Sequence, residues 1–247
     1  MRIGILGDIH SNLEALEAVL GAAEDDGIEH WVQVGDIVGY GADPVPCVDR
    51  VRELGCTVCM GNHDAAVVGF LATDYFNHYA RDAIEWTRDN LDAERLDWLR
   101  SLELVVEHEH YQLVHGSLFL PDRFGYVLGP AEAVSSMERQ SKAMTFVGHS
   151  HVPALYVQRN LGEPDKLQVL FESEFEASVA GIPKSLLNVG SVGQPRDEDP
   201  RAAYGVYDTE TRIAGVRRVE YDIETTQRKI RAAGLPTVLA DRLQLGV

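Results

Sequence analysis

The sequence predicts an α/β protein (α+β in some classifications) in which two β-sheets pack together within one domain, residues 1–247. Strands and helices alternate along the first half of the chain, which is the pattern of a parallel sheet covered by helices. The second half is richer in strands. At about 150 residues per domain, the length permits one large domain or two small ones, and no interdomain linker divides the chain.

Each predicted strand of the first half ends at a glycine that is followed by polar residues. Ser11-Asn12-Leu13-Glu14 has the form of a capping box, and apolar residues then recur at helical spacing until Gly27. Pro44 and Pro46 open a second helix that runs to about Leu54. The β-α-β-α-β order predicts a mainly parallel sheet with right-handed crossovers, formed by strands at 2–6, 31–34 and 57–60.

The second half combines helices with many short strands. Residues 75–100 form one or two helices, because apolar residues recur there at helical spacing. Residues 222–245 are predicted to be terminal helices packed on the domain, interrupted at 234–236 by Gly-Leu-Pro. The loop at 121–130 is long enough to form a rim or a lid. The remaining predicted strands lie at 103–108, 110–115, 144–148, 154–159, 167–171, 186–189, 203–208 and 213–219.

The net charge argues against an extended nucleic-acid surface. The chain has 22 Lys and Arg against 39 Asp and Glu, which gives a formal charge of −17, and it contains no Lys/Arg-rich run. Affinity for nucleic acids depends on cationic side chains that neutralise phosphates. We therefore expect no strong nucleic-acid binding, and a small substrate instead of a polymer.

The sequence also predicts a cytoplasmic protein. No uncharged apolar run reaches the roughly 18 residues of a membrane span. The apolar run from Ile3 to Leu6 is too short for the core of a signal peptide and is followed by Asp8. The three cysteines are an odd number, which argues against a disulfide framework.

Side chains that can bind metals follow five of the predicted strands. In open parallel sheets, ligands gather at the carboxyl ends of the strands. A single Asp or His after a strand is typically a capping or surface residue, but five polar clusters at strand ends have no packing role. The sequence therefore predicts a metal site at the C-terminal edge of the strands, with ligands drawn from Asp8, His10, Asp36, Asn62, His63, Asp64, His115, His149 and His151.

The types of these donors indicate which metal is bound. Carboxylates, imidazoles and one amide oxygen suit a pair of borderline divalent ions, with Mn²⁺ favoured and Fe, Zn²⁺ or Ni²⁺ as alternatives. A structural zinc site would instead be closed by Cys and His. Two ions need a shared ligand, and Asp36 follows a central strand, which suits that place. Such a pair holds the attacking and leaving oxygens of an in-line displacement.

The order of these motifs resembles the calcineurin-like metallophosphoesterase superfamily. The series is Asp8-x-His10, Gly35-Asp36, Gly61-Asn62-His63-Asp64, His115-Gly116 and Gly148-His149-Ser150-His151. The stretch 188–197, Asn-Val-Gly-Ser-Val-Gly-Gln-Pro-Arg-Asp, also resembles the YfcE-like bacterial and archaeal phosphodiesterases. The resemblance implies a four-layer αββα sandwich of two mixed sheets, with a dinuclear metal centre at the sheet edge.

The resemblance also implies a role for each residue. Asp36 would bridge the two ions. His63 would stabilise the transition state or protonate the leaving alkoxide, a step that general acids accelerate by about 10²–10⁴-fold, and Asp64 would orient His63. The ligands of the first ion would be Asp8, His10 and His151, and those of the second Asn62, His115 and His149.

The implied activity is hydrolysis of a small phosphoester, most simply a phosphodiester, by in-line attack of a metal-bridging hydroxide. A phosphomonoesterase and a dinucleoside polyphosphate hydrolase are the alternatives. A Ser/Thr protein phosphatase is disfavoured, because Ile37-Val38-Gly39-Tyr40 follows Asp36 in place of an Asp-Arg-Gly run, and Asp64 replaces a Glu. A non-catalytic scaffold is disfavoured, because every ligand position and His63 are present.

Six further residues are candidates for substrate binding. Arg123 and Arg196 are placed to contact phosphate, and four further residues are placed to line the substrate mouth: Asn12, Tyr40, Phe124 and Tyr126.

Overall fold

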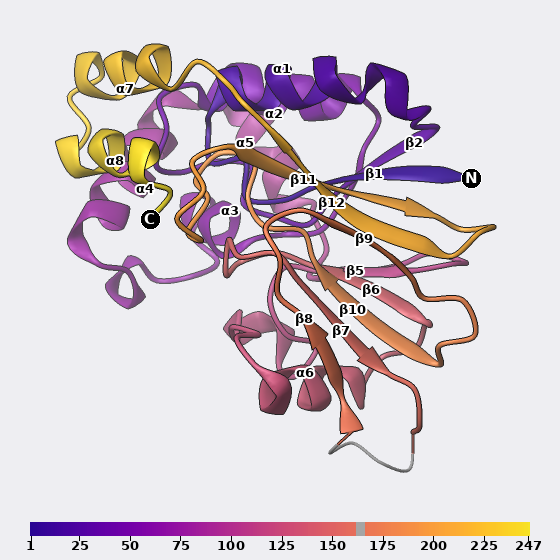
Figure 1. The fold of residues 1–247 in the computed structure, drawn as a ribbon. Helices are drawn as coiled ribbons and strands as arrows, with labels where there is room; N and C mark the ends of the chain where they lie inside the picture. Colours follow the sequence, from indigo (N-terminus) through magenta and orange to yellow (C-terminus); the bar gives the residue numbers. More distant parts are fainter. Residues whose placement is uncertain (162–165) are drawn as a thin grey trace.

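The computed structural model describes residues 1–161 and 166–247 and contains two six-stranded sheets. The strand orders are β3-β2-β1-β11-β12-β9 and β4-β5-β6-β10-β7-β8. Figure 1 shows the two sheets packed face to face, with α1 and α2 on the outer side of the first and α6 on the outer side of the second. The predicted sandwich of two mixed sheets between helical layers is confirmed.

The first sheet is parallel on one side and antiparallel on the other. Strands β1, β2 and β3 are parallel and are joined by crossover helices α1 and α2, as the alternating pattern predicts. The Asn12 side chain caps α1 by accepting a hydrogen bond from the Ala15 N–H at 3.1 Å. Strands β11, β12 and β9 extend the sheet in antiparallel fashion. The bounds are β1 (Arg2–Leu6), α1 (Leu13–Ala22), β2 (His30–Gln33), α2 (Pro44–Glu53), β3 (Thr57–Val58), β9 (Phe175–Ser178), β11 (Ala202–Asp208) and β12 (Ile213–Val219).

The second sheet is also mixed. Its central strand β6 pairs in parallel with both β5 and β10, and the outer pairs are antiparallel. The strands therefore bring the C-terminal ends of β5 and β6 to the edge at which β1 and β2 also end. The bounds are β4 (Val105–Glu107), β5 (Gln112–Val114), β6 (Met144–Val147), β7 (Ala154–Gln158), β8 (Gln168–Leu170) and β10 (Lys184–Asn188).

The core between the sheets consists of fully buried aliphatic and aromatic side chains. Ile3 and Ile5 of β1 pack in one cluster with Phe146 of β6, Leu187 of β10 and Tyr207 of β11. Burying one such side chain contributes roughly 1.5–3 kcal/mol to stability. This core joins the two sheets and so fixes the relative positions of the loops at their shared edge.

The remaining helices lie around the sheets. Two helices occupy the predicted segment 75–100, and the break predicted at Gly234 separates α7 from α8. Three elements were not predicted: α3, α6 and β9. Helix α3 is short and carries the polar Asn62-His63-Asp64, and α6 is rich in small residues, so neither has a clear apolar period. Strand β9 alternates apolar and polar residues over only four positions. The helix bounds are α3 (Asn62–Val67), α4 (His78–Asn90), α5 (Ala93–Arg100), α6 (Pro130–Met137), α7 (Ile223–Ala232) and α8 (Thr237–Asp241).

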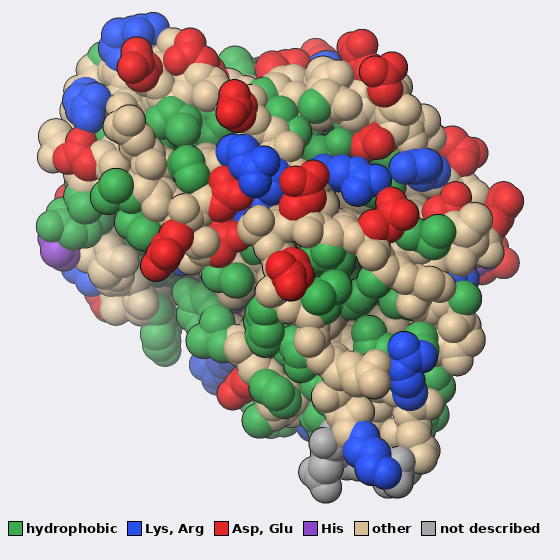
Figure 2. All heavy atoms as spheres, in the orientation of Figure 1, with side chains coloured by type: hydrophobic (Ala, Val, Ile, Leu, Met, Phe, Trp, Pro, Cys, Tyr) green, Lys and Arg blue, Asp and Glu red, His purple; other side chains and the backbone are tan. Residues whose placement is uncertain are grey.

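The C-terminal helices attach to the start of α1 and α2. Lys229 of α7 pairs with Glu14 and Asp43, at 2.5 and 2.8 Å, and the Thr226 hydroxyl donates to Asn12 Oδ1 at 3.0 Å. None of the helices that the structure describes is long and apolar enough to cross a membrane. On the face shown in Figure 2, acidic side chains are interspersed with Lys and Arg, and its described residues form no broad basic surface.

Candidate metal centre

The seven predicted ligands meet at one edge of the sandwich, and we call them the ligand cluster. Each follows a strand: β1 leads to two of them, β2 and β5 to one each, β6 to two, and Asn62 begins α3 after β3. All are at most 9% exposed. Both sheets contribute, so the cluster forms only in the folded chain. Its members are Asp8, His10, Asp36, Asn62, His115, His149 and His151.

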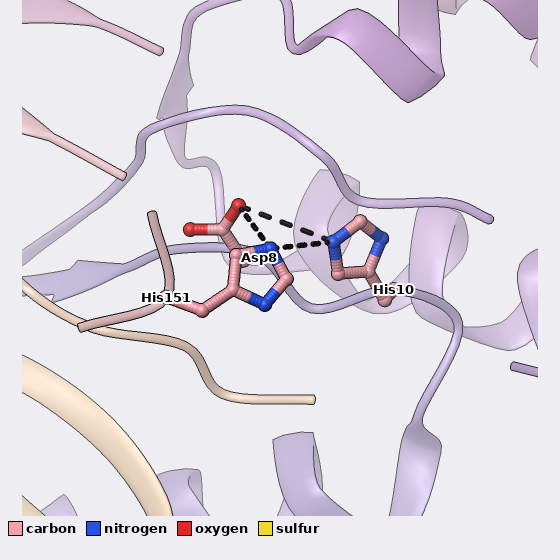
Figure 3. Close-up of side chains that lie close together, drawn as sticks. All are labelled: Asp8, His10 and His151. Atoms are coloured by element: carbon pink, nitrogen blue, oxygen red, sulfur yellow. Dashed lines mark hydrogen bonds and ion pairs between the residues drawn. The ribbon is translucent and has the colours of Figure 1, made fainter. Parts of the chain in front are cut away.

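One half of the ligand cluster is formed by Asp8, His10 and His151, whose side chains point toward one another in Figure 3. The Nε2 atoms of His10 and His151 are 3.2 Å apart, and Asp8 Oδ1 lies 3.2 Å from His151 Nε2 and 4.0 Å from His10 Nε2. Three donor atoms thus surround one point, as the ligands of a single ion do.

The other half is centred on His115. Its Nε2 lies 3.0 Å from Asn62 Oδ1, 3.1 Å from His149 Nδ1 and 3.3 Å from Asp36 Oδ2. The same Asp36 oxygen lies 3.6 Å from His10 Nε2 in the first half. Asp36 therefore stands between the two groups, in the place that a bridging ligand requires.

Backbone carbonyls fix how three of the imidazoles are protonated. The Nδ1 atoms of His10, His115 and His151 lie 3.1, 2.8 and 2.5 Å from the carbonyls of Val38, Val34 and Gln194. A carbonyl only accepts, so each Nδ1 donates, and Nε2 of the neutral ring is an acceptor.

This protonation leaves acceptors facing acceptors. Since Nε2 of His10 and Nε2 of His151 both carry lone pairs at 3.2 Å, neither can donate to the other when the rings are neutral. A cation between them satisfies both, and metal–nitrogen distances of about 2.0–2.1 Å are compatible with that spacing. The donor set therefore fits a pair of divalent ions.

The loops that carry the ligand cluster have an unusual backbone. Eleven non-glycine residues have positive φ among the described residues, and five of them are ligands. Side chains rarely adopt this left-handed region, so its cost is maintained by surrounding structure, and such strain gathers at functional sites. Here the Asp8 N–H donates to Gly35 O and the His10 N–H to Asp36 O, which locks the β1 and β2 loops together. The five ligands are Asp8, His10, Asp36, His149 and His151, with φ between 49° and 68°.

His63 lies beside the ligand cluster, and its ring nitrogen comes within 4.8 Å of ligand atoms of His10 and Asp36, so the three side chains could also hold an ion. The His63 ring centroid is 4.8 Å from that of His10 and 4.4 Å from that of Tyr40. Its Nδ1 is buried, has no hydrogen-bond partner among the described residues and faces Gly39, where an added Cβ would come within 2.4 Å. Burial lowers the pKa of His63 to about 4.

Asp64 does not orient His63 through a hydrogen bond in the described part of the chain. Its carboxylate accepts from four backbone N–H groups, those of Asp36, Ile37, Val38 and Gly61, at 2.8 to 3.3 Å. The observed contacts therefore correct the expected one: Asp64 holds the loop that presents Asp36. Burial, followed by the charge of Asp36, raises the pKa of Asp64 to about 7.

His115 shows the opposite electrostatic balance. Burial alone would lower its pKa, but the Asp36 carboxylate outweighs burial and raises the pKa of His115 to about 9. An anionic carboxylate this close is the environment in which a cation binds in place of the proton.

A cavity of about 400 Å³ opens above the ligand cluster. Four ligands and His63 line it. Five of the six residues predicted to contact the substrate or line its mouth also line the cavity: Tyr40, Arg123, Phe124, Tyr126 and Arg196. The loop predicted at 121–130 therefore does form part of the rim. Asn12 lies outside the cavity: it is 1% exposed, caps α1 and donates to Gly193 O at 2.9 Å, so it is structural.

Residues 1–212 match the calcineurin-like phosphoesterase superfamily domain. The chain belongs to this superfamily. It is 38% identical, over 99% of this chain and 98% of the relative, to an uncharacterized protein of Methanocaldococcus jannaschii. The crystal structure of a metallophosphoesterase from Sphaerobacter thermophilus is 38% identical and covers 100% of this chain and 99% of its own, with a TM-score of 0.89.

More distant relatives have named activities. The symmetrical bis(5'-nucleosyl)-tetraphosphatase of Nitrosomonas europaea is 28% identical over 78% of this chain and 72% of its own length. The E. coli phosphoesterase YfcE has a similar structure at 19% identity, with a TM-score of 0.46 over 90% of this chain and 100% of its own. The predicted superfamily is confirmed, and this metallophosphoesterase is a phosphoester hydrolase.

Arg196 brings a guanidinium to the cavity of this metallophosphoesterase. The group lies over the Tyr40 ring, 5.8 Å from its centroid, and donates to Gln194 Oε1 at 2.9 Å. Its Nε is buried and has no partner among the described residues. The backbone N–H of Arg196 donates to the His151 carbonyl, and the Gln194 carbonyl accepts from the His151 ring. The short segment 194–196 therefore both holds His151 in place and brings the Arg196 guanidinium to the cavity.

Sequence reasoning missed the other side of the cavity. Leu71, Tyr75, Phe76 and Asn77, which precede α4, also line it. Residues 75–77 were predicted to belong to the helical segment 75–100, whereas α4 begins only at His78, so no signal in the sequence placed them at the cavity.

Proposed function

We propose that the protein is a phosphodiesterase that hydrolyses a small phosphodiester with two divalent metal ions, for which Mn²⁺ fits the mixed nitrogen and oxygen donors. The observation that carries the proposal is that four metal-ligand side chains and His63 line one cavity of about 400 Å³. A phosphoryl group seated there contacts both halves of the ligand cluster at once.

The two halves of the ligand cluster divide the ions between them. Asp36 is the shared ligand, because one of its oxygens faces both halves. When bound, two divalent ions neutralise phosphoryl charge and lower the pKa of a water molecule toward neutrality. The first ion would be held by Asp8, His10 and His151, and the second by Asn62, His115 and His149.

Two further residues act on the substrate directly. His63 turns Nδ1 toward Gly39, so Nε2 is the ring nitrogen left to donate a hydrogen bond or a proton to the leaving oxygen. Arg196 presents its guanidinium to a non-bridging phosphoryl oxygen, and such charge-assisted hydrogen bonds are about twice as strong as neutral ones.

A diester is favoured by what surrounds the ligand cluster. The cavity is walled by apolar and aromatic side chains, among them Leu71, Phe76 and Phe124. These contacts suit organic groups on phosphorus, and the volume leaves room for two of them. A phosphomonoester would leave much of this surface uncovered.

A dinucleoside polyphosphate hydrolase is the second candidate. It is supported by the 28% identity, over 78% of this chain, to a symmetrical bis(5'-nucleosyl)-tetraphosphatase. Such a substrate would use the same ligand cluster, and its attacked phosphorus lies in a phosphoanhydride.

The test compares bis(p-nitrophenyl) phosphate, p-nitrophenyl phosphate and diadenosine tetraphosphate as substrates of the purified protein, with Mn²⁺ and with EDTA. We expect diester hydrolysis that EDTA abolishes and added Mn²⁺ restores. Turnover of the monoester alone would replace the proposal with a phosphomonoesterase. Conversion of diadenosine tetraphosphate to ADP without diester turnover would establish the second candidate. A protein that binds no metal and hydrolyses none of the three would contradict both.

His63→Ala tests the division of roles. We expect the variant to retain both metal ions and to lose about 10²–10⁴-fold in turnover, the range of general acid catalysis. Elemental analysis and steady-state kinetics measure the two effects. His110→Ala, an exposed site in the turn between β4 and β5, is the control and should change neither. Loss of metal from His63→Ala would show that His63 is a ligand.

A further inference from the structure

Exposed apolar side chains gather around the cavity. Seven of the twelve large hydrophobic side chains that are exposed in the described chain lie in two segments, 70–79 and 119–128. Both segments contribute lining residues to the cavity. Two of the seven, Tyr75 and Tyr126, line the cavity itself. Exposed apolar side chains at a cavity are typical of a binding site. The seven are Phe70, Tyr75, Tyr79, Phe119, Leu120, Tyr126 and Leu128.

Four aromatic residues in these segments line the cavity: Tyr75, Phe76, Phe124 and Tyr126. We call Tyr75, Phe76 and Tyr126 the aromatic wall. Two of them contact rings of the catalytic centre. Tyr126 stacks on His149 with centroids 3.8 Å apart and an angle of 15°, and Phe76 meets His63 edge-on at 5.1 Å. Tyr75 is 76% exposed and touches neither ring in the described contacts. The aromatic wall thus begins at the catalytic centre and continues toward solvent.

Polar groups stand beside the aromatic faces. Asn77 lines the cavity and caps α4 through its oxygen, at 3.0 Å from the Ala80 N–H, so its amide NH₂ remains a donor. Arg123 lines the cavity with a side chain that is 71% exposed. Planar aromatic faces with donors at their edge suit a planar heterocycle better than an aliphatic chain.

We propose that the aromatic wall binds the base of a nucleoside that forms one of the two alcohols of the phosphodiester. The inference rests on the proposed function, because the ligand cluster must hold the phosphoryl group for the base to reach the wall. The cavity of about 400 Å³ exceeds what a phosphoryl group occupies and falls in the range of sites for ligands of nucleotide size, roughly 300–1,000 Å³. Tyr75 is the outermost stacking surface, and Tyr126 and Phe76 connect it to the catalytic centre.

The decisive comparison uses two diesters that differ only in the base. Adenosine 5'-(methyl phosphate) carries it, and the methyl ester of ribose 5-phosphate lacks it. With the Mn²⁺-loaded enzyme, kcat/KM for the adenosine ester should exceed that for the ribose ester at least about fivefold, since stacking of one base on an aromatic side chain changes affinity by about 5- to 150-fold. Equal values would overturn the proposal.

Tyr75→Ala and a control variant test whether the preference for the adenosine ester comes from the aromatic wall. Tyr75→Ala should bring the ratio of the two kcat/KM values close to one. Tyr79→Ala removes a neighbouring tyrosine that lines a separate groove with Trp86 and Leu235, and should leave the ratio at the wild-type value. A Tyr75→Ala variant that keeps the wild-type ratio would place the base elsewhere and contradict the proposal.

A binding measurement separates this proposal from the proposed function. The phosphodiesterase proposal stands or falls with bis(p-nitrophenyl) phosphate. If neither methyl ester is hydrolysed, calorimetry with adenosine 5'-monophosphate and ribose 5-phosphate tests the aromatic wall by itself. Tighter binding of the adenosine compound that Tyr75→Ala removes supports the wall. Equal binding of the two compounds overturns it.

Discussion

The ligand cluster and the aromatic wall line the same cavity but are held in different ways. The ligand cluster is at most 9% exposed, rests on left-handed backbone and has three of its rings tied to carbonyls. Tyr75 and Tyr126 of the aromatic wall are 76% and 47% exposed. We therefore expect the buried ligand cluster to determine the chemistry and the exposed aromatic wall to determine which ester is accepted. Substitutions in the ligand cluster should alter metal content and stability, and substitutions in the aromatic wall should alter substrate selectivity alone.

The largest effect is expected at Asp36, the residue that both halves of the ligand cluster share. Asp36→Asn keeps the side-chain oxygen that accepts from the His63 N–H and tolerates the positive φ, but removes the charge. Both ions should be lost in parallel, and turnover should fall by about 10²–10³-fold or more. Elemental analysis against Asp92→Asn, at the exposed cap of α5, checks the result. Retention of one ion at full occupancy would refute the bridge.

A smaller effect, on stability, is expected at Asp64. Asp64→Asn leaves one acceptor oxygen where the carboxylate serves four backbone N–H groups. Each buried group left unsatisfied costs about 1–3 kcal/mol, so the free energy of unfolding should fall by more than it does for an exposed cap. Urea unfolding in EDTA compares Asp64→Asn with Asp222→Asn, which keeps a capping oxygen for the Thr225 N–H at the exposed start of α7. Equal losses in the two variants would contradict the role assigned to Asp64.

Alanine substitutions at Gly39 and Gly55 distinguish the cost of a left-handed backbone from that of a steric contact with His63. It has φ +93°, and a Cβ there would lie 2.4 Å from His63 Nδ1, whereas Gly55 has φ +63° and open space around it. Alanine at either position should cost about 1–2 kcal/mol from the left-handed backbone. Only Gly39→Ala should also lower turnover, because it displaces His63. Thermal unfolding and kinetics measure both effects, and similar turnover in the two variants would show that the ring tolerates the added methyl group.

The smallest effect belongs to the aromatic wall. Tyr75→Ala should leave the metal content at the wild-type value and change the free energy of unfolding by no more than about 0.5 kcal/mol, as is usual for exposed residues. Loss of metal or a large loss of stability in this variant would remove the distinction between the two regions.

The same contrast explains what could be predicted from the sequence. The ligand cluster could be predicted, because metal chemistry restricts each position to a few residue types and strand ends bring them to one edge. Its backbone conformation could not, since left-handed φ at Asp8 or His149 depends on contacts with loops distant in sequence. Asp64 could be picked out as important, but its partners could not, because they are backbone groups of another loop.

The aromatic wall could not be predicted, since nothing in the local sequence distinguishes Tyr75 or Phe76 from residues that pack in the core. Their position depends on how the segment before α4 lies against the loop at 121–126. Asn12, which was predicted to line the substrate mouth, is buried because it caps α1 and accepts a hydrogen bond from Thr226 of α7.

Anomalous diffraction from crystals grown with Mn²⁺ tests the central claim, that the buried edge is a dinuclear metal centre. We expect two manganese peaks in each chain, one beside Asp8, His10 and His151 and the other beside Asn62, His115 and His149, with Asp36 contacting both. A single peak, or two peaks that do not share Asp36, would contradict this claim.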